Sequence, residues 1–246
     1  MELEDKIAVV TGGSRGVGRG IVLRLIEEGA KVTFCYEANK SAADEVLNEI
    51  KTKKGIGFVQ KVDVSKRSEV QSFIDNVIGK FGRLDILVSN AGIQRHGSFI
   101  EHKEEDWHRV LDVDLTGVFN CGQIAARIMI KQKYGKIINI SSRMYFGAVD
   151  VVSYSAAKAG IVGLTKSMAM ELGPYNINVN CIAPGAIETE LAAAMPAGFR
   201  EERIAVTPLR RFGLPEEIGH AVVFLASEKA AFITGEVLHI TGGLYG

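Results

Sequence analysis

Short apolar runs alternate with longer amphipathic stretches along the chain, and this alternation carries the first prediction about its fold. The runs are rich in β-branched residues and apolar at consecutive positions, which favours strands buried on both faces. They cover Lys6–Val10, Lys31–Cys35, Gly57–Gln60, Ile86–Ser89, Lys136–Ile140, Asn178–Ile182 and Glu236–Ile240. The stretches between them repeat hydrophobic residues at helical spacing and cover Val17–Glu28, Ser41–Lys53, Ser68–Phe81, Glu104–Gln132, Ser153–Leu172 and Pro215–Ala226. Because crossovers between parallel strands are right-handed and need helices, we predict an α/β fold, a doubly wound parallel sheet of about seven strands with helices on both faces.

The chain shows no internal boundary. No repeat, low-complexity tract or Pro- and Ser-rich linker divides it, so we expect a single domain over residues 1–246. Only the stretch 186–212 lacks a clear period, and it is rich in Ala, Pro and Gly. Ligands of doubly wound sheets bind beyond the carboxyl ends of the strands. We therefore interpret residues 186–212 as a mobile substrate lid, with a plain surface loop as the alternative.

Charge and cysteine content narrow the function classes. The chain has 29 Lys and Arg residues against 29 Asp and Glu residues, a balance that gives no reason to expect binding to nucleic acid or a membrane. Cys35, Cys121 and Cys181 lack metal-ligand spacing, so we expect reduced buried thiols and no metal site. The acidic start of the chain is unlike a signal peptide, and no apolar run approaches the ~20 residues of a membrane helix. A cytoplasmic protein is the expectation.

A glycine-rich turn follows the first predicted strand. Thr11–Gly18 reads Thr-Gly-Gly-Ser-Arg-Gly-Val-Gly and leads directly into the first predicted helix. Glycines allow the backbone to approach a pyrophosphate, and a helix N-terminus offers unpaired N–H groups and the positive end of its dipole. This order of strand, turn and helix predicts a dinucleotide-binding loop.

A tyrosine and a lysine suggest proton chemistry further along the chain. Tyr154 and Lys158 are four residues apart in a predicted helix and share one of its faces, with Ser142 twelve residues upstream of the tyrosine. A lysine ammonium near a phenol favours the phenolate. Such a tyrosine can give or take a proton at neutral pH, as carbonyl reduction and alcohol oxidation require.

With both motifs in the expected order, the chain resembles the short-chain dehydrogenase/reductase family almost from end to end. Further matches are Asp63-Val64 beside the adenine, Asn90-Ala91-Gly92 after the fourth strand, and Pro184-Gly185 with Thr189 at the nicotinamide carboxamide. The resemblance implies a Rossmann-type fold and a bound NAD or NADP. The positions it assigns to the cofactor are Gly12, Ser14, Arg15, Gly16, Val17, Gly18, Tyr36, Glu37, Asp63, Val64, Asn90, Ala91, Gly92, Tyr154, Lys158, Pro184, Gly185, Ile187 and Thr189.

The same resemblance assigns the catalytic roles. Tyr154 is expected to be the acid or base, and Lys158 to support it and hold the nicotinamide ribose. Ser142 is expected to hydrogen-bond the substrate oxygen, although Ser141 is an adjacent rival that chemistry alone does not separate from it. The hydride belongs to the nicotinamide, so the protein supplies orientation and the proton.

One position departs from the family pattern. Where the family usually carries an asparagine that supports a water near the lysine, this chain has Asp114. A carboxylate near Lys158 would stabilise the ammonium and partly cancel its field on Tyr154. We therefore count Asp114 among the catalytic positions and expect reduced or pH-shifted activity.

The sequence leaves the choice of cofactor in conflict. Glu37 lies about 20 residues past the glycine loop, where an acid usually binds the ribose 2′-hydroxyl of NAD. In the family, however, the discriminating acid usually falls one residue earlier, where this chain has Tyr36. Arg15 resembles the arginine that pairs with the 2′-phosphate in NADP-preferring members, and Asn39 and Lys40 could assist it. We favour NADP, with NAD or dual use as the alternative.

The identity of the substrate is the property that the sequence determines least. By resemblance, Gln94, Arg143, Met144, Ser142 and Tyr154 should contact it. The overall resemblance is nearest to the 3-oxoacyl-(acyl carrier protein) reductases, which implies a carbonyl substrate carried on an acyl carrier protein or coenzyme A. Sugar, polyol or hydroxysteroid dehydrogenases of the same family are the alternative, because the segment after Pro184 resembles them equally well.

Three further expectations concern partners and other functions. Lys131, Lys133 and Lys136 could form part of a basic patch for an acidic carrier protein. The helical stretch Glu104–Gln132 and the C-terminal strand resemble the family's assembly surfaces, which implies a homotetramer. Two other classes stay open: a cofactor-binding regulator with little catalysis, and an isomerase, dehydratase or epimerase on the same scaffold.

Overall fold

The fold is built on one parallel sheet. The computed structural model describes residues 1–193 and 197–244. Its seven strands are ordered β3-β2-β1-β4-β5-β6-β7, all neighbours being parallel. They are β1 (Ile7–Val10), β2 (Lys31–Tyr36), β3 (Gly57–Lys61), β4 (Ile86–Ser89), β5 (Gly135–Ile140), β6 (Ile177–Pro184) and β7 (Val237–Ile240). The seven predicted strands are therefore confirmed, and the order reverses direction between β1 and β4, which is where doubly wound sheets bind ligands.

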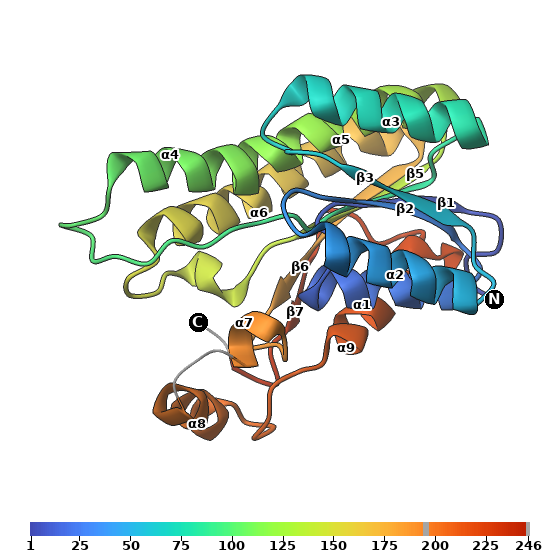
Figure 1. Ribbon diagram of the computed structural model, residues 1–246. Helices are drawn as coiled ribbons and strands as arrows, with labels where there is room; N and C mark the ends of the chain where they lie inside the picture. The colour runs from blue at the N-terminus through green and yellow to red at the C-terminus, as the bar shows by residue number, and fades with distance from the viewer. Residues whose placement is uncertain (194–196, 245–246) are drawn as a thin grey trace.

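Helices cover both faces of the sheet, as the alternating pattern predicted. Figure 1 shows α3, α4, α5 and α6 on one side and α1, α2 and α9 on the other. Their bounds are α1 (Gly16–Glu27), α2 (Lys40–Thr52), α3 (Arg67–Phe81), α4 (Glu104–Leu111), α5 (Gly117–Gln132), α6 (Val152–Leu172) and α9 (Pro215–Ala226). Each face has its own apolar core, since alternate strand residues such as Val9 and Val10 point to opposite sides.

The helix predicted over Glu104–Gln132 is interrupted. A π-helical turn, Asp112–Thr116, separates α4 from α5 while the backbone remains helical. The hydrophobic period could not predict this turn, because one widened turn changes the spacing by only about one residue. The turn matters for the site, since it contains Asp114.

Two short helices lie in the stretch 186–212, where the sequence shows no clear period. They are α7 (Glu190–Ala193) and α8 (Ala197–Val206), and Figure 1 shows both beyond the end of β6, with α8 set apart from the other helices. The base of the stretch is held by the backbone: Glu188 N–H donates to Gly213 O at 2.8 Å and Gly213 N–H donates to Ala186 O at 2.9 Å. Helices this short carry too few turns to give a clear period in the sequence.

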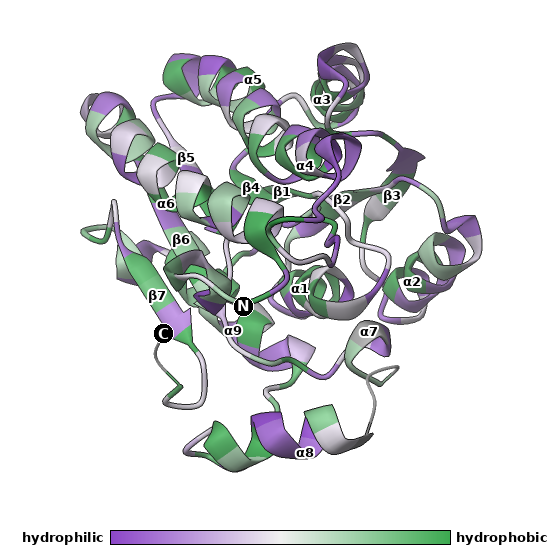
Figure 2. Ribbon diagram, turned by 90° about the vertical axis from the view of Figure 1, so that its left-hand side faces the viewer, coloured by the Kyte–Doolittle hydropathy of each residue, from purple (hydrophilic) through white to green (hydrophobic). Residues whose placement is uncertain are grey.

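The hydropathy colours follow the same plan. In Figure 2 the strands and the inner sides of the helices are largely hydrophobic, and β7 forms the outer edge of the sheet. Among the described residues, no helix is long and apolar enough to cross a bilayer. The three cysteines are free and buried, as expected from the sequence.

Candidate active site

The glycine loop forms a cradle at the carboxyl end of β1. Gly12 has a φ of +65°, and a Cβ on it would lie 2.9 Å from Ala91 Cα. A Cβ on Gly18 would lie 2.1 Å from Gly12 O, so both positions need glycine. Asn90 closes the loop from β4, its side-chain amide donating to Thr11 O at 3.0 Å and Gly12 O at 3.1 Å.

The first turn of α1 is left open for an anion. Arg15, at the N-cap position, makes no side-chain capping bond, so the N–H groups of the first turn keep their hydrogen-bonding capacity. The residues present thus fit a dinucleotide: a backbone that a Cβ would obstruct meets the positive end of a helix dipole. A bound nicotinamide dinucleotide would bring a hydride donor or acceptor to this edge of the sheet.

Predicted adenine-side residues lie at the ends of β2 and β3. Tyr36 ends β2, Glu37 follows it and is exposed, and Asp63 follows β3 with Val64. Asp63 accepts from the Ser65 hydroxyl at 2.6 Å and pairs with Arg109 at 3.3 Å. Although partial burial opposes it, these contacts lower the pKa of Asp63. This carboxylate therefore stays ionised beside the expected adenine position.

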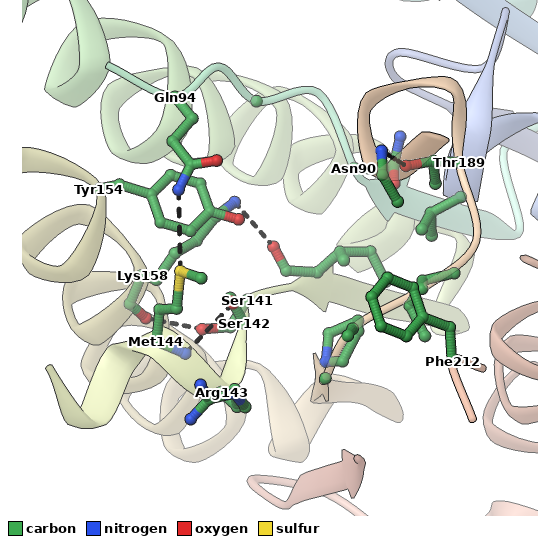
Figure 3. Close-up of a pocket in the computed structure, with 18 of the residues that line it drawn as sticks. Asn90, Gln94, Ser141, Ser142, Arg143, Met144, Tyr154, Lys158, Thr189 and Phe212 are labelled. Carbon is green, nitrogen blue, oxygen red and sulfur yellow. Dashed lines mark hydrogen bonds between the residues drawn. The ribbon is translucent and has the colours of Figure 1, made fainter. Parts of the chain in front are cut away.

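Three of the predicted catalytic residues, Ser142, Tyr154 and Lys158, line one cavity of about 290 Å³, whereas Asp114 does not line it. In Figure 3, Tyr154 and Lys158 of α6 lie side by side near Ser142, with Asn90 and Thr189 across the cavity. The Lys158 ammonium lies 5.2 Å from the centre of the Tyr154 ring and donates to Ile140 O at 3.2 Å. Of the predicted cofactor positions, the cavity is lined by Val17, Asn90, Gly92, Tyr154, Lys158, Pro184, Gly185, Ile187 and Thr189. The other predicted cofactor positions do not line it, and they follow β1, β2, β3 and β4 at the same edge of the sheet.

The structure distinguishes the two adjacent serines. Ser141 is buried, and its hydroxyl donates to the backbone oxygen of Lys158 at 2.8 Å, which ties β5 to α6. Ser142 is partly exposed, and its oxygen accepts only from Met144 N–H, at 3.2 Å, among the contacts of the described chain. Its own proton is therefore available to a substrate oxygen.

Asp114 brings a negative charge directly to Lys158. Its Oδ2 lies 3.1 Å from Lys158 Nζ, although that oxygen accepts no well-aligned hydrogen bond, and its Oδ1 accepts from Ile93 N–H at 2.7 Å. Both ionic groups are buried. A Cβ on Gly92 would lie 2.7 Å from Asp114 Oδ2, so this glycine makes room for the pair.

Burial and charge act in opposite directions on this pair. Burial raises the pKa of Asp114 above its usual value, although Lys158 and the Ile93 N–H pull it down. Burial by itself would lower the pKa of Lys158, but the Asp114 carboxylate, together with Tyr154 and Cys181, outweighs it and the pKa is raised. Since breaking a buried pair leaves an uncompensated charge, we take Lys158 as an ammonium matched by the Asp114 carboxylate.

The substrate side is formed by two loops and α8. Gln94, after β4, donates to the sulfur of Met144, after β5, at 3.8 Å, so the two predicted substrate loops touch. Arg143 lines the cavity with them, as predicted. Several lining residues were not predicted from the sequence, namely Ile93, Ile140, Ala186, Ala192, Phe199, Arg203 and Phe212. Phe199 and Arg203 are four residues apart, a spacing that gave a weak signal of one helix face.

The prediction that Lys131, Lys133 and Lys136 contribute to a basic patch near the entrance of the cavity is wrong. Lys136 is buried at the amino end of β5, where its ammonium donates to Asn178 Oδ1 at 2.8 Å. Lys131 and Lys133 lie at the end of α5, beside the same strand end. Because the strands are parallel, all their amino ends lie on the side of the sheet opposite the cavity. These lysines therefore cannot surround the entrance of the cavity.

Comparison with known proteins identifies the family. A family model described as enoyl-(acyl carrier protein) reductase matches residues 12–245. The chain is 44% identical over 243 residues to the 3-oxoacyl-[acyl-carrier-protein] reductase FabG of Staphylococcus aureus, with 98% of each chain covered. It is 40% identical over 245 residues to that of Thermotoga maritima, with 99% of each covered. The chain belongs to the short-chain dehydrogenase/reductase family.

Solved structures of this family share the whole fold. A short-chain dehydrogenase/reductase from Serratia marcescens superposes with a TM-score of 0.94 at 38% identity, covering 99% of both chains. A putative gluconate dehydrogenase from Agrobacterium tumefaciens also reaches 0.94, at 34% identity, covering 98% of this chain and 96% of the other. The resemblance inferred from the motifs is thus confirmed, and the chain is an NAD(P)-dependent oxidoreductase that interconverts a carbonyl and an alcohol.

Proposed function

We propose that this protein reduces 3-oxoacyl thioesters, with an acyl carrier protein or coenzyme A as the carrier. The observation that carries the proposal is the full-length similarity to bacterial 3-oxoacyl-[acyl-carrier-protein] reductases. The cavity agrees with such chemistry, because a serine, a tyrosine and a lysine line it together. The whole chain acts as one unit, with the described parts of the lid, residues 186–193 and 197–212, closing over the substrate; residues 194–196 of the predicted lid lie outside the described residues.

In this mechanism each residue has one task. Ser142 donates a hydrogen bond to the substrate oxygen, and Tyr154 donates the proton that the forming alkoxide takes up. Lys158 keeps its positive charge next to Tyr154 and would hold the ribose of a bound nicotinamide cofactor. Asp114 and Ile140 O keep the ammonium in place. The cradle around Gly12 and Gly18 would hold the pyrophosphate, and Thr189 with Pro184 and Gly185 would hold the carboxamide.

NADP is the proposed cofactor. Arg15 is exposed beside the glycine loop and has no ion-pair partner among the residues that the structure describes, so its guanidinium is free for a 2′-phosphate. Lys40, the other candidate cation, is paired with Asp44 at 2.6 Å. Glu37 is exposed after β2, where it can turn away from the phosphate. Arg15→Ala should lower kcat/KM with NADPH about tenfold and leave that with NADH nearly unchanged.

A cytoplasmic homotetramer is the proposed state of the enzyme. Large apolar side chains are exposed on α5, α6, α9 and near the edge strand β7, which is unusual for a monomer. They are Phe119, Met170, Phe224, Phe232 and Leu238. Light scattering on a sizing column tests this state directly, and a monomeric mass at micromolar concentration would contradict it.

The activity is tested by following NADPH and NADH oxidation with a short 3-oxoacyl thioester. We expect rapid oxidation of NADPH that depends on the thioester. Turnover of polyols or sugars with NADP⁺ or NAD⁺, without turnover of the thioester, would instead support the second candidate, a sugar or polyol dehydrogenase. That candidate rests on the structural similarity to a putative gluconate dehydrogenase.

A further inference from the structure

Two arginines from separate segments line the substrate side of the cavity. Arg143 directly follows Ser142 after β5, and Arg203 comes from α8. In Figure 3, Arg143 lies beside Ser142 and Met144. Neither arginine has an ion-pair partner among the residues that the structure describes; Arg203 only stacks over the Phe199 ring, at 4.7 Å from its centre.

Three other arginines near the lid and the cavity mouth are each paired with a carboxylate. Arg200 of α8 pairs with Glu188 at 2.7 Å, and Arg211 pairs with Glu217 at 2.6 Å. Arg95, after β4, pairs with Asp106 at 3.2 Å. The third cation of the cavity, Lys158, is matched by Asp114.

The cavity therefore has an excess of positive charge where the substrate lies. Its described lining includes no Asp or Glu side chain. Burial lowers the pKa of Arg143, and the like charge of Arg203 acts in the same direction. Because a guanidinium stays charged at every physiological pH, an anion bound between the two side chains would relieve their repulsion.

From this geometry, and building on the proposed carbonyl reduction, we infer that the substrate carries a carboxylate a few bonds from the reacting carbonyl, bound by Arg143 and Arg203. The short spacing is part of the inference and is based on Arg143 following Ser142 directly and lining the same cavity. The phosphate of a pantetheine arm lies much farther from the thioester than this. A carboxylate suits two planar guanidinium forks, and Phe199 with Phe212 would contact the short apolar spacer.

The carboxylate can belong to a free oxo acid or to the far end of an acyl thioester. Two matched pairs separate these sources at the same spacing between ketone and carboxylate. The first is 4-oxopentanoate with its methyl ester, and the second is a 3-oxoadipyl thioester with its terminal methyl ester. We expect kcat/KM for the acid to exceed that for the ester about tenfold or more in at least one pair. The pair in which the enzyme prefers the acid to the ester shows whether the carboxylate belongs to a free oxo acid or to an acyl thioester.

Variants of the two arginines test whether their side chains bind the carboxylate of the substrate. Arg143→Gln and Arg203→Gln should each lower the acid-to-ester ratio about tenfold, and Arg143→Lys should restore part of it. Arg95→Gln is the matched control, because Asp106 already neutralises that arginine, and its ratio should equal that of the wild type. The KM for NADPH, measured in parallel, separates an effect on the substrate from one on the cofactor.

The outcomes of this experiment and of the proposed function are distinct. Ratios near one in both pairs for the wild-type enzyme, with good turnover of the esters, would overturn the inference and leave the reductase activity standing. An unchanged preference in the folded Arg143→Gln and Arg203→Gln variants would also overturn it. Turnover of the free acid alone would support the inference and contradict the thioester assignment. No turnover of any ketone would contradict the proposed function itself.

Discussion

The two halves of the site recognise their ligands by different means. The cofactor half is made of backbone: Gly12 and Gly18 leave room for a pyrophosphate, and Asn90 fixes the loop through backbone oxygens. The substrate half is made of side chains, with Arg143 after β5 and Arg203 on α8. A backbone cradle tolerates few changes, whereas side chains on loops can change without disturbing the sheet. The first half is therefore the part that tolerates the least change, and the second half is the part that we propose selects the substrate.

The largest expected effect comes from removing the proton donor of the substrate half. Tyr154→Phe should lower kcat about a thousandfold, because the alkoxide loses its acid. NADPH binding, followed by fluorescence, should persist, since the cradle is separate. Tyr175→Phe is the control, as Tyr175 lies on a turn at the opposite edge of the sheet. Retention of more than about a tenth of the activity would assign the proton to another group.

The next effect tests the cofactor half. Gly18→Ala would place a Cβ 2.1 Å from Gly12 O, which forces the loop apart. We expect the Kd for NADPH to rise about tenfold to a hundredfold and the Tm to fall. Gly79→Ala is the control, since a Cβ on that α3 residue meets nothing within 4 Å, and its Tm should rise slightly. Unchanged NADPH affinity in Gly18→Ala would show that the backbone cradle is not what binds the cofactor.

A smaller change in kcat is expected from a substitution at Asp114, where the cofactor half and the substrate half of the site meet. Asp114→Asn keeps an oxygen for Ile93 N–H but removes the charge opposite Lys158. Asp114 raises the pKa of Lys158, so its loss should let that ammonium deprotonate at lower pH. It should also free the field of Lys158 to act on Tyr154, so that kcat near neutral pH rises a few-fold and the pH–rate profile moves to lower pH. Asp112→Asn, an exposed neighbour, serves as the control, and an unshifted profile would contradict the coupling.

The smallest effect concerns the anchor of the lid. Arg211 and the Leu214 N–H both bind Glu217 at the start of α9, and they lower its pKa from 4.5 to about 2. A carboxyl whose pKa is lowered on folding stabilises the protein above its unfolded pKa and loses that effect as pH falls through the folded value. The Tm difference between wild type and Glu217→Gln should therefore be a few degrees or less at pH 7 and fade between pH 4.5 and pH 2. A difference that grows on acidification would exclude this role.

The local pattern of apolar residues predicted all the strands of the sheet, but not where each strand ends or which side chains lie near the cavity. All seven strands were predicted, yet β6 runs on to Pro184, because Ala183 and Pro184 pair with His239 and Ile240 of β7. The lysines expected to form a docking patch were placed at the wrong edge. Periodicity identifies a strand and a helix but not which end of the sheet a charged residue reaches.

The sequence by itself determined the family and predicted the glycine cradle and the candidate catalytic residues, because these depend on short-range spacing that a linear motif preserves. The tertiary structure decided what depends on contacts between distant segments. The π-helical turn carries Asp114 to Lys158, which is 44 residues away in the chain yet 3.1 Å away in space. Folding likewise brings α8 and the loop after β5 to one cavity, so that two arginines without carboxylate partners among the described residues line it together. Electrostatic balance depends on distance and burial, and neither can be counted along a sequence.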